Sequence, residues 1–285
     1  MRTRIENKQF SEERALYNII DTDVVNVTFA GIEDGESVLK EIRNCNVSHC
    51  NFSLRYPLWH AEVFDLTHST LDELTRAPIW YSNNGNITHT TIKGVKPVRE
   101  CNNINIQFCT IDTIEFGWKC SNLNIENSTI HGPYLLLDSS NIKINNFTMS
   151  GKYSFQYVKN LHINNSTLDT KDAFWHAENV VVENSTVKGE YLGWYSNNLT
   201  FINCHIIGTQ PLCYCENLKL INCTMEQTDL AFEYSSVDAN IIGHIDSIKN
   251  PLSGNITCDS VGEIIFDSTV KECLGKISIR NKEIA

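Results

Sequence analysis

Residues 122–130 read NLNIENSTI, and the same pattern returns five more times along the chain. Each copy has an Asn, an aliphatic residue, any residue, a second aliphatic residue, and then a short polar stretch that ends in another aliphatic. The further copies are NIKINNFTM (141–149), NLHINNSTL (160–168), NVVVENSTV (179–187), NLTFINCHI (198–206) and NLKLINCTM (217–225). The second aliphatic recurs every 19 residues from Ile87 to Leu220, and earlier members lie at Val27, Val47 and Leu66. This internal repeat decides the fold.

Aliphatic residues at alternate positions, such as Leu123 and Ile125, are typical of a β-strand, and each repeat is too short for a pair of helices. A strand unit repeated at this period stacks on its neighbours in parallel and forms a solenoid. The sequence therefore predicts an all-β, single-stranded, right-handed parallel β-helix of about 11 coils, with the handedness taken from the rule for parallel crossovers. We expect one domain, with an N-terminal cap over 1–24, the regular β-helix over 25–235, and irregular last coils with a C-terminal cap over 236–285.

Charge and composition limit the possible partners. The chain has 23 basic and 34 acidic residues, a formal net charge of −11, which argues against nucleic acid because phosphate binding needs a basic surface. No apolar run approaches the length of a membrane span. The first residues, MRTRIENKQFSEER, lack an apolar signal-peptide core, so we expect a cytoplasmic protein whose eleven cysteines are reduced. The sequence leaves the oligomeric state undefined.

All five tryptophans fall in one column of the repeat, which we call the tryptophan column. In register it reads Lys40, Trp59, Trp80, Arg99, Trp118, Leu137, Gln156, Trp175, Trp194, Cys213 and Phe232. The next residues form the polar column: Glu41, His60, Tyr81, Glu100, Lys119, Asp138, Tyr157, His176, Tyr195, Tyr214 and Glu233. The preceding residues, from Leu39 to Ala231, are apolar or Gly and form the apolar column. Strict strand alternation would turn the tryptophans inward, whereas an inward apolar column requires a bend there, and both arrangements remain open.

The tryptophan column has two interpretations. It is either an aromatic stack that fills the core, or a face whose rings bind sugar rings while charged neighbours supply hydrogen bonds. The candidate ligand-binding residues are Trp59, Trp80, Arg99, Trp118, Tyr157, Trp175, Trp194 and Tyr195. The expected partner is an oligosaccharide or another small polar ligand.

Acid–base chemistry has weaker candidates. Glu100 and Asp138 lie two coils apart, a backbone separation of roughly 9.6 Å along the axis, at the limit of the range for inverting glycosidases. Lys119 lies between them and favours their charged forms, so the alternative is a solvated row of ion pairs. Asp172 with His176 is a second candidate, as an oriented base. No paired C-x-x-C spacing and no nucleotide or metalloprotease motif occurs, so we expect no metal site and no cofactor.

Several segments resemble a bacterial domain-of-unknown-function family of the pectate-lyase-like β-helix superfamily. They are LRYPLWH (54–60), EFGWKC (115–120), GKYSFQYV (151–158), TKDAFWH (170–176), GEYLGWYS (189–196), GTQPLCYC (208–215) and DLAFEYS (229–235). The resemblance implies the β-helix fold over most of the chain and transfers no activity. We therefore expect a protein that binds or modifies carbohydrate through an aromatic and charged face, and the alternative is a non-catalytic scaffold or protein-interaction module.

Overall fold

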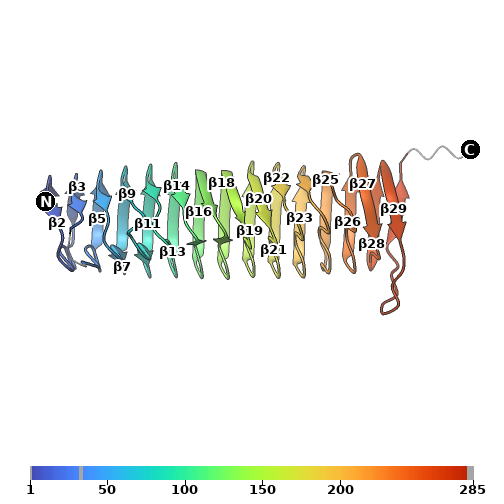
Figure 1. Cartoon of the computed structure of the whole chain (residues 1–285), viewed down its shortest axis with the longest axis horizontal. Helices are drawn as coiled ribbons and strands as arrows, with labels where there is room; N and C mark the ends of the chain where they lie inside the picture. Colours follow the sequence, from blue (N-terminus) through green and yellow to red (C-terminus); the bar gives the residue numbers. More distant parts are fainter. Residues whose placement is uncertain (1, 32–34, 281–285) are drawn as a thin grey trace, which may run out of the picture. The chain divides into compact units, whose positions relative to one another are not determined.

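The computed structural model describes residues 2–31 and 35–280, and its regular elements there are all β-strands. Within those ranges no helix is long and apolar enough to cross a membrane. The chain divides into two compact units, Met1–Thr148 (unit 1) and Met149–Ala285 (unit 2), and each is described by itself. In both units successive coils pair through parallel strands, which confirms the predicted parallel β-helix (Figure 1).

Unit 1 has two long columns of parallel strands. The first column consists of β1 (Thr3–Glu6), β3 (Thr22–Val25), β5 (Arg43–Ser48), β8 (Glu62–Thr67), β11 (Asn83–Thr88), β13 (Asn102–Gln107) and β16 (Ser121–Gly132). The second consists of β2 (Gln9–Phe10), β4 (Thr28–Phe29), β6 (Asn51–Phe52), β9 (Thr70–Leu71), β12 (Thr91–Ile92) and β14 (Thr110–Asp112), and it continues into the second half of β16. Two short pairs complete the coils: β7 (Leu58–Trp59) with β10 (Ile79–Trp80), and β15 (Glu115–Phe116) with β17 (Tyr134–Leu135). Strand β18 (Ser140–Lys152) contains the boundary between the units.

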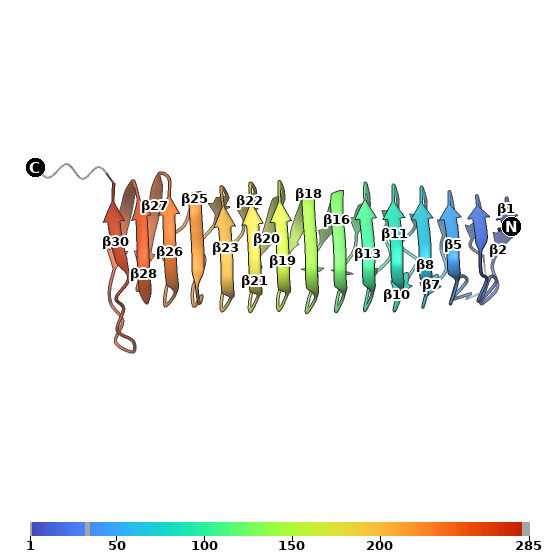
Figure 2. The same cartoon turned by 180° about the vertical axis from the view of Figure 1, so that it is seen from behind.

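Unit 2 repeats this plan with a less regular end. Its strands are β19 (Lys159–Asn164), β20 (Thr167–Lys171), β21 (Glu178–Glu183), β22 (Thr186–Lys188), β23 (Asn197–Ile202), β24 (His205–Ile207), β25 (Leu218–Glu226), β26 (Ser236–Ile241), β27 (His244–Lys249), β28 (Ser253–Cys258), β29 (Ser260–Ile265) and β30 (Lys276–Ile279). The register between β25 and β26 shifts between Leu220 and Cys223. The long connection between β29 and β30 projects away from the coils (Figure 2).

The number of coils is larger than the expected 11, at about 14 turns. Residues 3–10 already contain β1 and β2, which pair in register with β3 and β4. At the other end, residues 236–280 contain five more strands, from β26 to β30. The spacing of the C-terminal coils is irregular, since Ser236 pairs with Ser253 and Asn255 with Lys276, so the 19-residue pattern does not reveal them. The first coil keeps the regular step, with Thr3 opposite Thr22.

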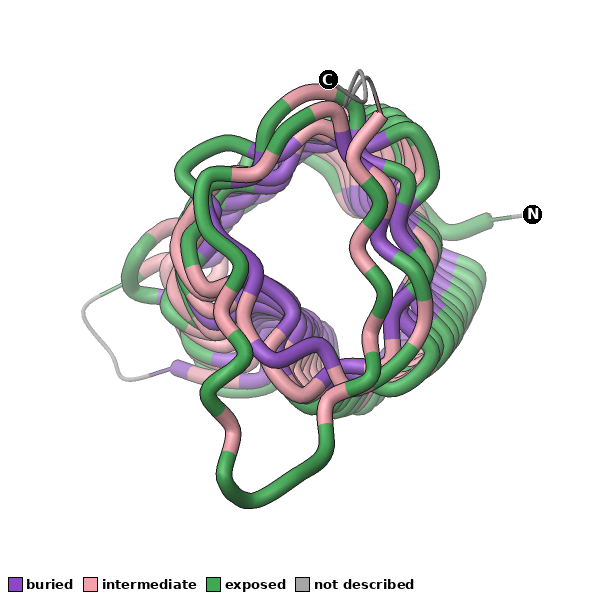
Figure 3. Tube along the Cα trace, turned by 90° about the vertical axis from the view of Figure 1, so that its right-hand side faces the viewer, coloured by how far each residue is buried: buried purple, intermediate pink, exposed green. Residues whose placement is uncertain are grey.

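Inward-facing side chains of consecutive coils stack on one another and form the core. In unit 1 the Phe29 ring lies 5.9 Å from Phe10 and 4.8 Å from Phe52, measured between centroids. In unit 2 Phe155 and Phe174 are stacked at 5.0 Å. Buried and exposed residues alternate along the coils when the chain is seen end-on (Figure 3).

A column of small side chains, two residues after the tryptophan column, satisfies buried backbone groups between coils. In unit 1 the Ser139 hydroxyl accepts from the Cys120 N–H at 2.9 Å and donates to the Gly117 carbonyl at 2.7 Å. One coil earlier, the Cys120 thiol accepts from the Cys101 N–H at 3.4 Å. Serine and cysteine side chains therefore both accept a hydrogen bond from a buried backbone N–H of the preceding coil. In unit 2 burial raises the pKa of the Cys215 thiol, in the corresponding column, to about 11.

Removing this acceptor should destabilise the fold. We expect Ser139→Ala to lower the free energy of unfolding by about 1–3 kcal/mol, because the buried Cys120 N–H loses its partner. Ser139→Cys should lower it less, since Cys120 serves as such an acceptor in the neighbouring coil. Chemical denaturation followed by circular dichroism measures both. Equal losses for the two variants would contradict this role of the side chain.

Candidate functional site

The direction of the tryptophan column, which the sequence leaves open, is set by left-handed backbone beside the tryptophans. It lies on both sides of Trp118, Trp175 and Trp194, and only after Trp59 and Trp80. Phe174 and His176 flank Trp175, and both have a left-handed conformation, with φ of 62° and 55°. This breaks strand alternation, so Phe174 is fully buried, Trp175 half-buried and His176 exposed. Left-handed conformations are unfavourable for bulky residues, but hydrogen bonds between coils hold them here. The Phe174 N–H donates to the Ser154 carbonyl at 3.0 Å, and the His176 N–H to the Trp194 carbonyl at 3.0 Å.

The predicted register of the tryptophan column is wrong at its last member, Phe232. The Tyr214 N–H donates to the Glu233 carbonyl at 2.7 Å, and the Tyr214 ring lies 5.9 Å from that of Tyr234. Tyr234 therefore follows Tyr214 in the polar column, and Glu233 takes the position assigned to Phe232. Phe232 is fully buried instead. One additional residue in this coil causes the difference.

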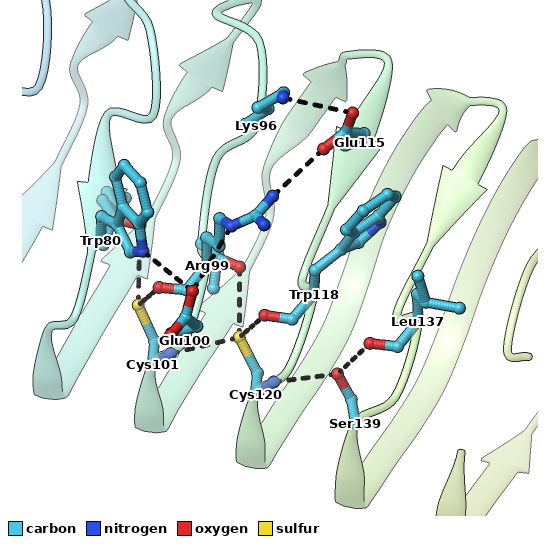
Figure 4. A network of polar contacts seen from close by, with 12 residues as sticks. Trp80, Lys96, Arg99, Glu100, Cys101, Glu115, Trp118, Cys120, Leu137 and Ser139 are labelled. Atoms are coloured by element: carbon cyan, nitrogen blue, oxygen red, sulfur yellow. Dashed lines mark hydrogen bonds and ion pairs between the residues drawn. The ribbon is translucent and has the colours of Figure 1, made fainter. Parts of the chain in front are cut away.

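In unit 1 the tryptophan column is a stack in which each ring covers the next. The Lys40 ammonium lies 5.0 Å from the Trp59 ring centroid, and the Trp59 and Trp80 rings are stacked at 5.8 Å and 14°. The Arg99 guanidinium lies 5.6 Å from Trp80 and 5.3 Å from Trp118, between the two rings (Figure 4). Because both faces of Trp59 and Trp80 are covered, a sugar ring cannot stack on either of these two indoles.

The carboxylate of Glu100, a candidate catalytic residue, is engaged in polar contacts with Arg99 and Trp80. The Glu100 carboxylate lies 3.6 Å from Arg99 Nε, and its Oε1 accepts from the Trp80 indole N–H at 3.4 Å (Figure 4). On the other side Arg99 pairs with Glu115 at 3.3 Å, which also pairs with Lys96 at 3.5 Å. Glu100 thus belongs to a network that holds the stack of Trp80 and Arg99 in place.

The register places Lys119 and Asp138 on the two coils that follow Glu100. The Glu100 N–H donates to the Trp118 carbonyl and the Lys119 N–H to the Leu137 carbonyl, each at 2.9 Å. Both Lys119 and Asp138 are exposed, and within residues 2–31 and 35–280 neither forms an ion pair with the other or with Glu100. Lys119 and Asp138 are therefore solvated, and together with Glu100 they form no enclosed site.

In unit 2 the tryptophans connect consecutive coils by stacking and by hydrogen bonds from their indole N–H groups. Trp175 and Trp194 are stacked at 5.5 Å with their planes at 6°. The Trp175 indole N–H donates to the Tyr191 carbonyl at 2.6 Å, and the Trp194 indole N–H donates to the Gln210 carbonyl at 2.9 Å. Each indole thus fixes the corner of the next coil.

The polar column of unit 2 is an exposed ladder of rings. His176 is stacked between Tyr157 at 4.9 Å and Tyr195 at 5.1 Å. About half of the surface of each tyrosine is exposed, 50% for Tyr157 and 48% for Tyr195. The ring faces cover one another, so this ladder presents mainly ring edges to solvent.

Asp172, the candidate partner of His176, lies elsewhere. Of the described side chains, those of Asp172 and His176 share no hydrogen bond or ion pair. Asp172 is only 6% exposed, and this burial raises the pKa of its carboxyl group, with Lys171 opposing the rise and Glu190 adding to it. Lys171 and Glu190 pair with each other at 2.7 Å. The structure therefore separates the two members of the expected pair.

A surface depression of about 530 Å³ in unit 1 brings together polar and aromatic side chains from three successive coils. Its lining residues are Glu41, Arg43, His60, Glu62, Tyr81 and Asn83. Three belong to the polar column, and the other three begin strands β5, β8 and β11. Between the two rows lie Ile42, Ala61 and Ser82, which are all buried. The inward turn of this middle row leaves the outward rows on either side of the depression.

The two carboxylates of the depression are held by hydrogen bonds from outside it. Glu41 accepts from the Tyr17 hydroxyl at 2.8 Å, and this bond holds the pKa of Glu41 below its usual range. Glu62 accepts from the Asn84 side chain at 2.5 Å.

The other polar groups of the depression are free for a ligand. Arg43, His60, Tyr81 and Asn83 make no side-chain hydrogen bond or ion pair within the described residues. Their rings are nevertheless positioned: His60 and Tyr81 are stacked at 5.1 Å, and Tyr81 also packs against Trp80 at 5.1 Å.

The repeat pattern predicts the polar column, which lines one side of this depression, but not the depression itself. His60 and Tyr81 belong to the polar column, whereas Arg43, Glu62 and Asn83 lie outside the three columns that the pattern distinguishes. The available signal was position in the repeat, since these three lie two residues after Glu41, His60 and Tyr81. In the described part of the chain, no group of three or more His, Cys, Asp or Glu side chains is arranged to hold a metal ion.

The raised pKa of Asp172 predicts a pH-dependent stability effect. The folded protein binds this proton more tightly than the unfolded chain, so the carboxyl group lowers stability as pH rises above its unfolded pKa of about 3.9. Asp172→Asn should therefore raise the unfolding temperature at pH 7 and lose this advantage at about pH 3, where the carboxyl group is protonated in both states. Asn also tolerates the left-handed backbone of this position, with φ of 54°.

The matched control for this prediction is Asp138→Asn. Asp138 is exposed and has a similar φ of 52°. Thermal unfolding at pH 7 should show a smaller change for Asp138→Asn than for Asp172→Asn, and at about pH 3 neither variant should show an advantage. An unfolding temperature of Asp172→Asn that does not exceed that of the unmodified protein at pH 7 would contradict the prediction.

Comparison with solved structures finds fold resemblances at low sequence identity. The mannuronan C-5 epimerase AlgE4 A-module of Azotobacter vinelandii is 11% identical, covering 96% of this chain and 89% of its own, with a TM-score of 0.29. The surface adhesin PfbA of Streptococcus pneumoniae is 11% identical, covering 97% and 82%, with a TM-score of 0.35. The endo-xylogalacturonan hydrolase of Aspergillus tubingensis is 10% identical, covering 88% and 87%, with a TM-score of 0.30. At these TM-scores we draw no functional conclusion from them.

No curated protein matches the chain at a significant level. A family described as "Protein of unknown function (DUF3737)" matches residues 3–279. This match confirms the resemblance to a domain-of-unknown-function family with a β-helix fold. Because it spans nearly the whole sequence, the chain belongs to this family, DUF3737.

Proposed function

We propose that the protein binds carbohydrate without modifying it, at the depression lined by Glu41, Arg43, His60, Glu62, Tyr81 and Asn83. The observation that supports this most is the combination of aromatic rings with both donors and acceptors of hydrogen bonds in one surface hollow. A sugar ring has apolar C–H faces and hydroxyl groups that donate and accept, so it needs this mixture of partners.

The stacking around the depression favours binding because it fixes the rings before a ligand arrives. His60 lies against Trp59 at 5.7 Å and 14°, and Tyr81 against Trp80 at 5.1 Å and 12°. Side chains that are already ordered lose little conformational entropy on binding. Trp59 and Trp80 thus support the ligand-contacting rings from behind.

The dimensions of the depression suit a short oligosaccharide. It spans three coils, so its ends are separated by roughly 10 Å at about 4.8 Å per coil. Its volume of about 530 Å³ lies within the usual range of ligand sites, about 300–1,000 Å³. A pyranose ring is about as long as one coil is thick, so two linked rings would meet corresponding positions on successive coils, which carry different side chains.

Hydrolysis is less well supported than binding. A glycosidase needs one carboxyl group that keeps its proton as the general acid. The hydrogen bond from Tyr17 lowers the pKa of Glu41 and favours its charged form, which suits an acceptor of sugar hydroxyls. Asp172, whose pKa is raised, lies in unit 2 and does not line this depression.

Tyr81→Ala should weaken sugar binding about tenfold, because the ligand loses an aromatic contact and a hydroxyl group. The ligand is first identified on an array of neutral and acidic oligosaccharides, and affinity is then measured by titration calorimetry. Tyr157→Ala is the matched control, since Tyr157 is an exposed polar-column tyrosine with a similar φ, 56° against 53° for Tyr81, outside the depression. It should leave affinity unchanged.

Two results would count against carbohydrate binding at this place. If no oligosaccharide binds or raises the unfolding temperature, the alternative of a non-catalytic scaffold is favoured. If Tyr157→Ala and Tyr81→Ala weaken binding equally, the sugar does not occupy the depression of unit 1.

A further inference from the structure

The charges of the depression lead to an inference about its ligand, which rests on the proposed carbohydrate binding. We infer that the site selects neutral sugars and discriminates against uronic acids, with Glu41 and Glu62 as the specificity-determining residues. The lining contains two carboxylates and one guanidinium group, that of Arg43. The whole chain carries a net charge of −11, so the field of the protein also opposes an anionic ligand.

Arg43 is the group that would attract a uronate, but its neighbours oppose this. It lies directly opposite Glu62 in the parallel pairing of β5 with β8, and Glu41 is two residues before it in the chain. The backbones of Arg43 and Glu62 are therefore about one coil spacing, roughly 4.8 Å, apart, and an anion that binds the Arg43 side chain also approaches that of Glu62. Like charges brought together on binding reduce affinity, and this is a common way in which binding sites reject the wrong ligand.

The same carboxylates favour a neutral sugar. A carboxylate has two oxygens that accept hydrogen bonds, and bonds to a charged acceptor are stronger than neutral ones. Glu41 uses Oε2 for Tyr17, and its Oε1 lies 3.7 Å from the Lys40 ammonium. Glu62 uses Oε1 for Asn84 and retains Oε2 for ligand hydroxyls. Arg43 and Asn83 supply donors for the ring and hydroxyl oxygens of the ligand. A hydroxymethyl group at C6 fits this set, whereas a carboxylate at C6 adds a third negative charge.

The test uses pairs of oligosaccharides that differ only at C6, with a hydroxymethyl group in one member and a carboxylate in the other. At low ionic strength we expect the neutral member to bind about tenfold more tightly. The ratio should shrink as salt is added, because salt screens charges near the surface. Tighter binding of the uronate, or equal binding of both members, would overturn the inference while leaving carbohydrate binding intact.

The variant Glu62→Gln identifies the residue responsible. It removes one negative charge but keeps an oxygen that can accept from Asn84. We expect it to improve uronate affinity severalfold and to narrow the ratio within each pair. The control is Glu178→Gln, which changes the net charge equally at the first residue of β21, as Glu62 is the first residue of β8, and should leave the ratio unchanged.

The outcomes separate the inference from the function on which it rests. If Glu178→Gln narrows the ratio as much as Glu62→Gln, the discrimination comes from net charge and the role of Glu62 is wrong. If no member of any pair binds, the proposed carbohydrate binding is itself refuted, and the specificity falls with it.

Discussion

Parallel hydrogen bonding between coils is the constraint on which each unit depends. It holds every residue opposite its counterpart one repeat away, as in the line of Ile87, Ile106 and Ile125 through β11, β13 and β16. Like side chains therefore stack on like. Inward-facing columns give ladders of phenylalanine, isoleucine and small residues, and outward-facing columns give ladders of amides, such as Asn103 donating to Asn84 at 3.0 Å. A substitution in an inner coil therefore changes the contacts with both neighbouring coils.

The corner beside the tryptophan column shows how this constraint outweighs local preference. Phe155, Phe174 and Leu212 adopt left-handed conformations that bulky residues avoid in isolation. They do so because the conformation turns their side chains into the core and lets their N–H groups reach the neighbouring coil, as Leu212 does with the Leu192 carbonyl. Burial of a large apolar side chain, worth about 1.5–3 kcal/mol, exceeds the cost of the backbone conformation, about 1–2 kcal/mol.

This corner also marks the limit of what the sequence predicts. The repeat predicts the fold class and the register from Trp80 to Trp194, because a 19-residue period leaves no other pairing of the strands. Which way the tryptophans face depends on left-handed residues beside them. A glycine marks such a position only at Gly117 and Gly193, and the others carry bulky residues such as Phe174 and His176. Phe232 was misplaced by one residue for a related reason: the pattern contains no marker of the extra residue in its coil. The depression was missed because it requires two columns to be considered together across three coils.

Stacking explains why the tryptophans are concentrated in one column yet are poor sugar platforms. A ring that covers the next ring gains contact along the axis of the coils and loses its free face, as Trp59 does between Lys40 and Trp80. The polar column obeys the same rule. In unit 2 its rings run without interruption from Tyr157 through His176 to Tyr195, and they stack face to face on one another.

In unit 1 the aromatic run of the polar column has only two rings, His60 and Tyr81, with the carboxylates of Glu41 and Glu100 on the adjoining coils. This interruption brings charged groups next to ordered rings without disturbing the buried residues between the rows, such as Ala61. Binding chemistry in such a fold is therefore expected where an outward ladder stops, because there the side chains have unsatisfied groups while the hydrogen bonds between coils continue unchanged.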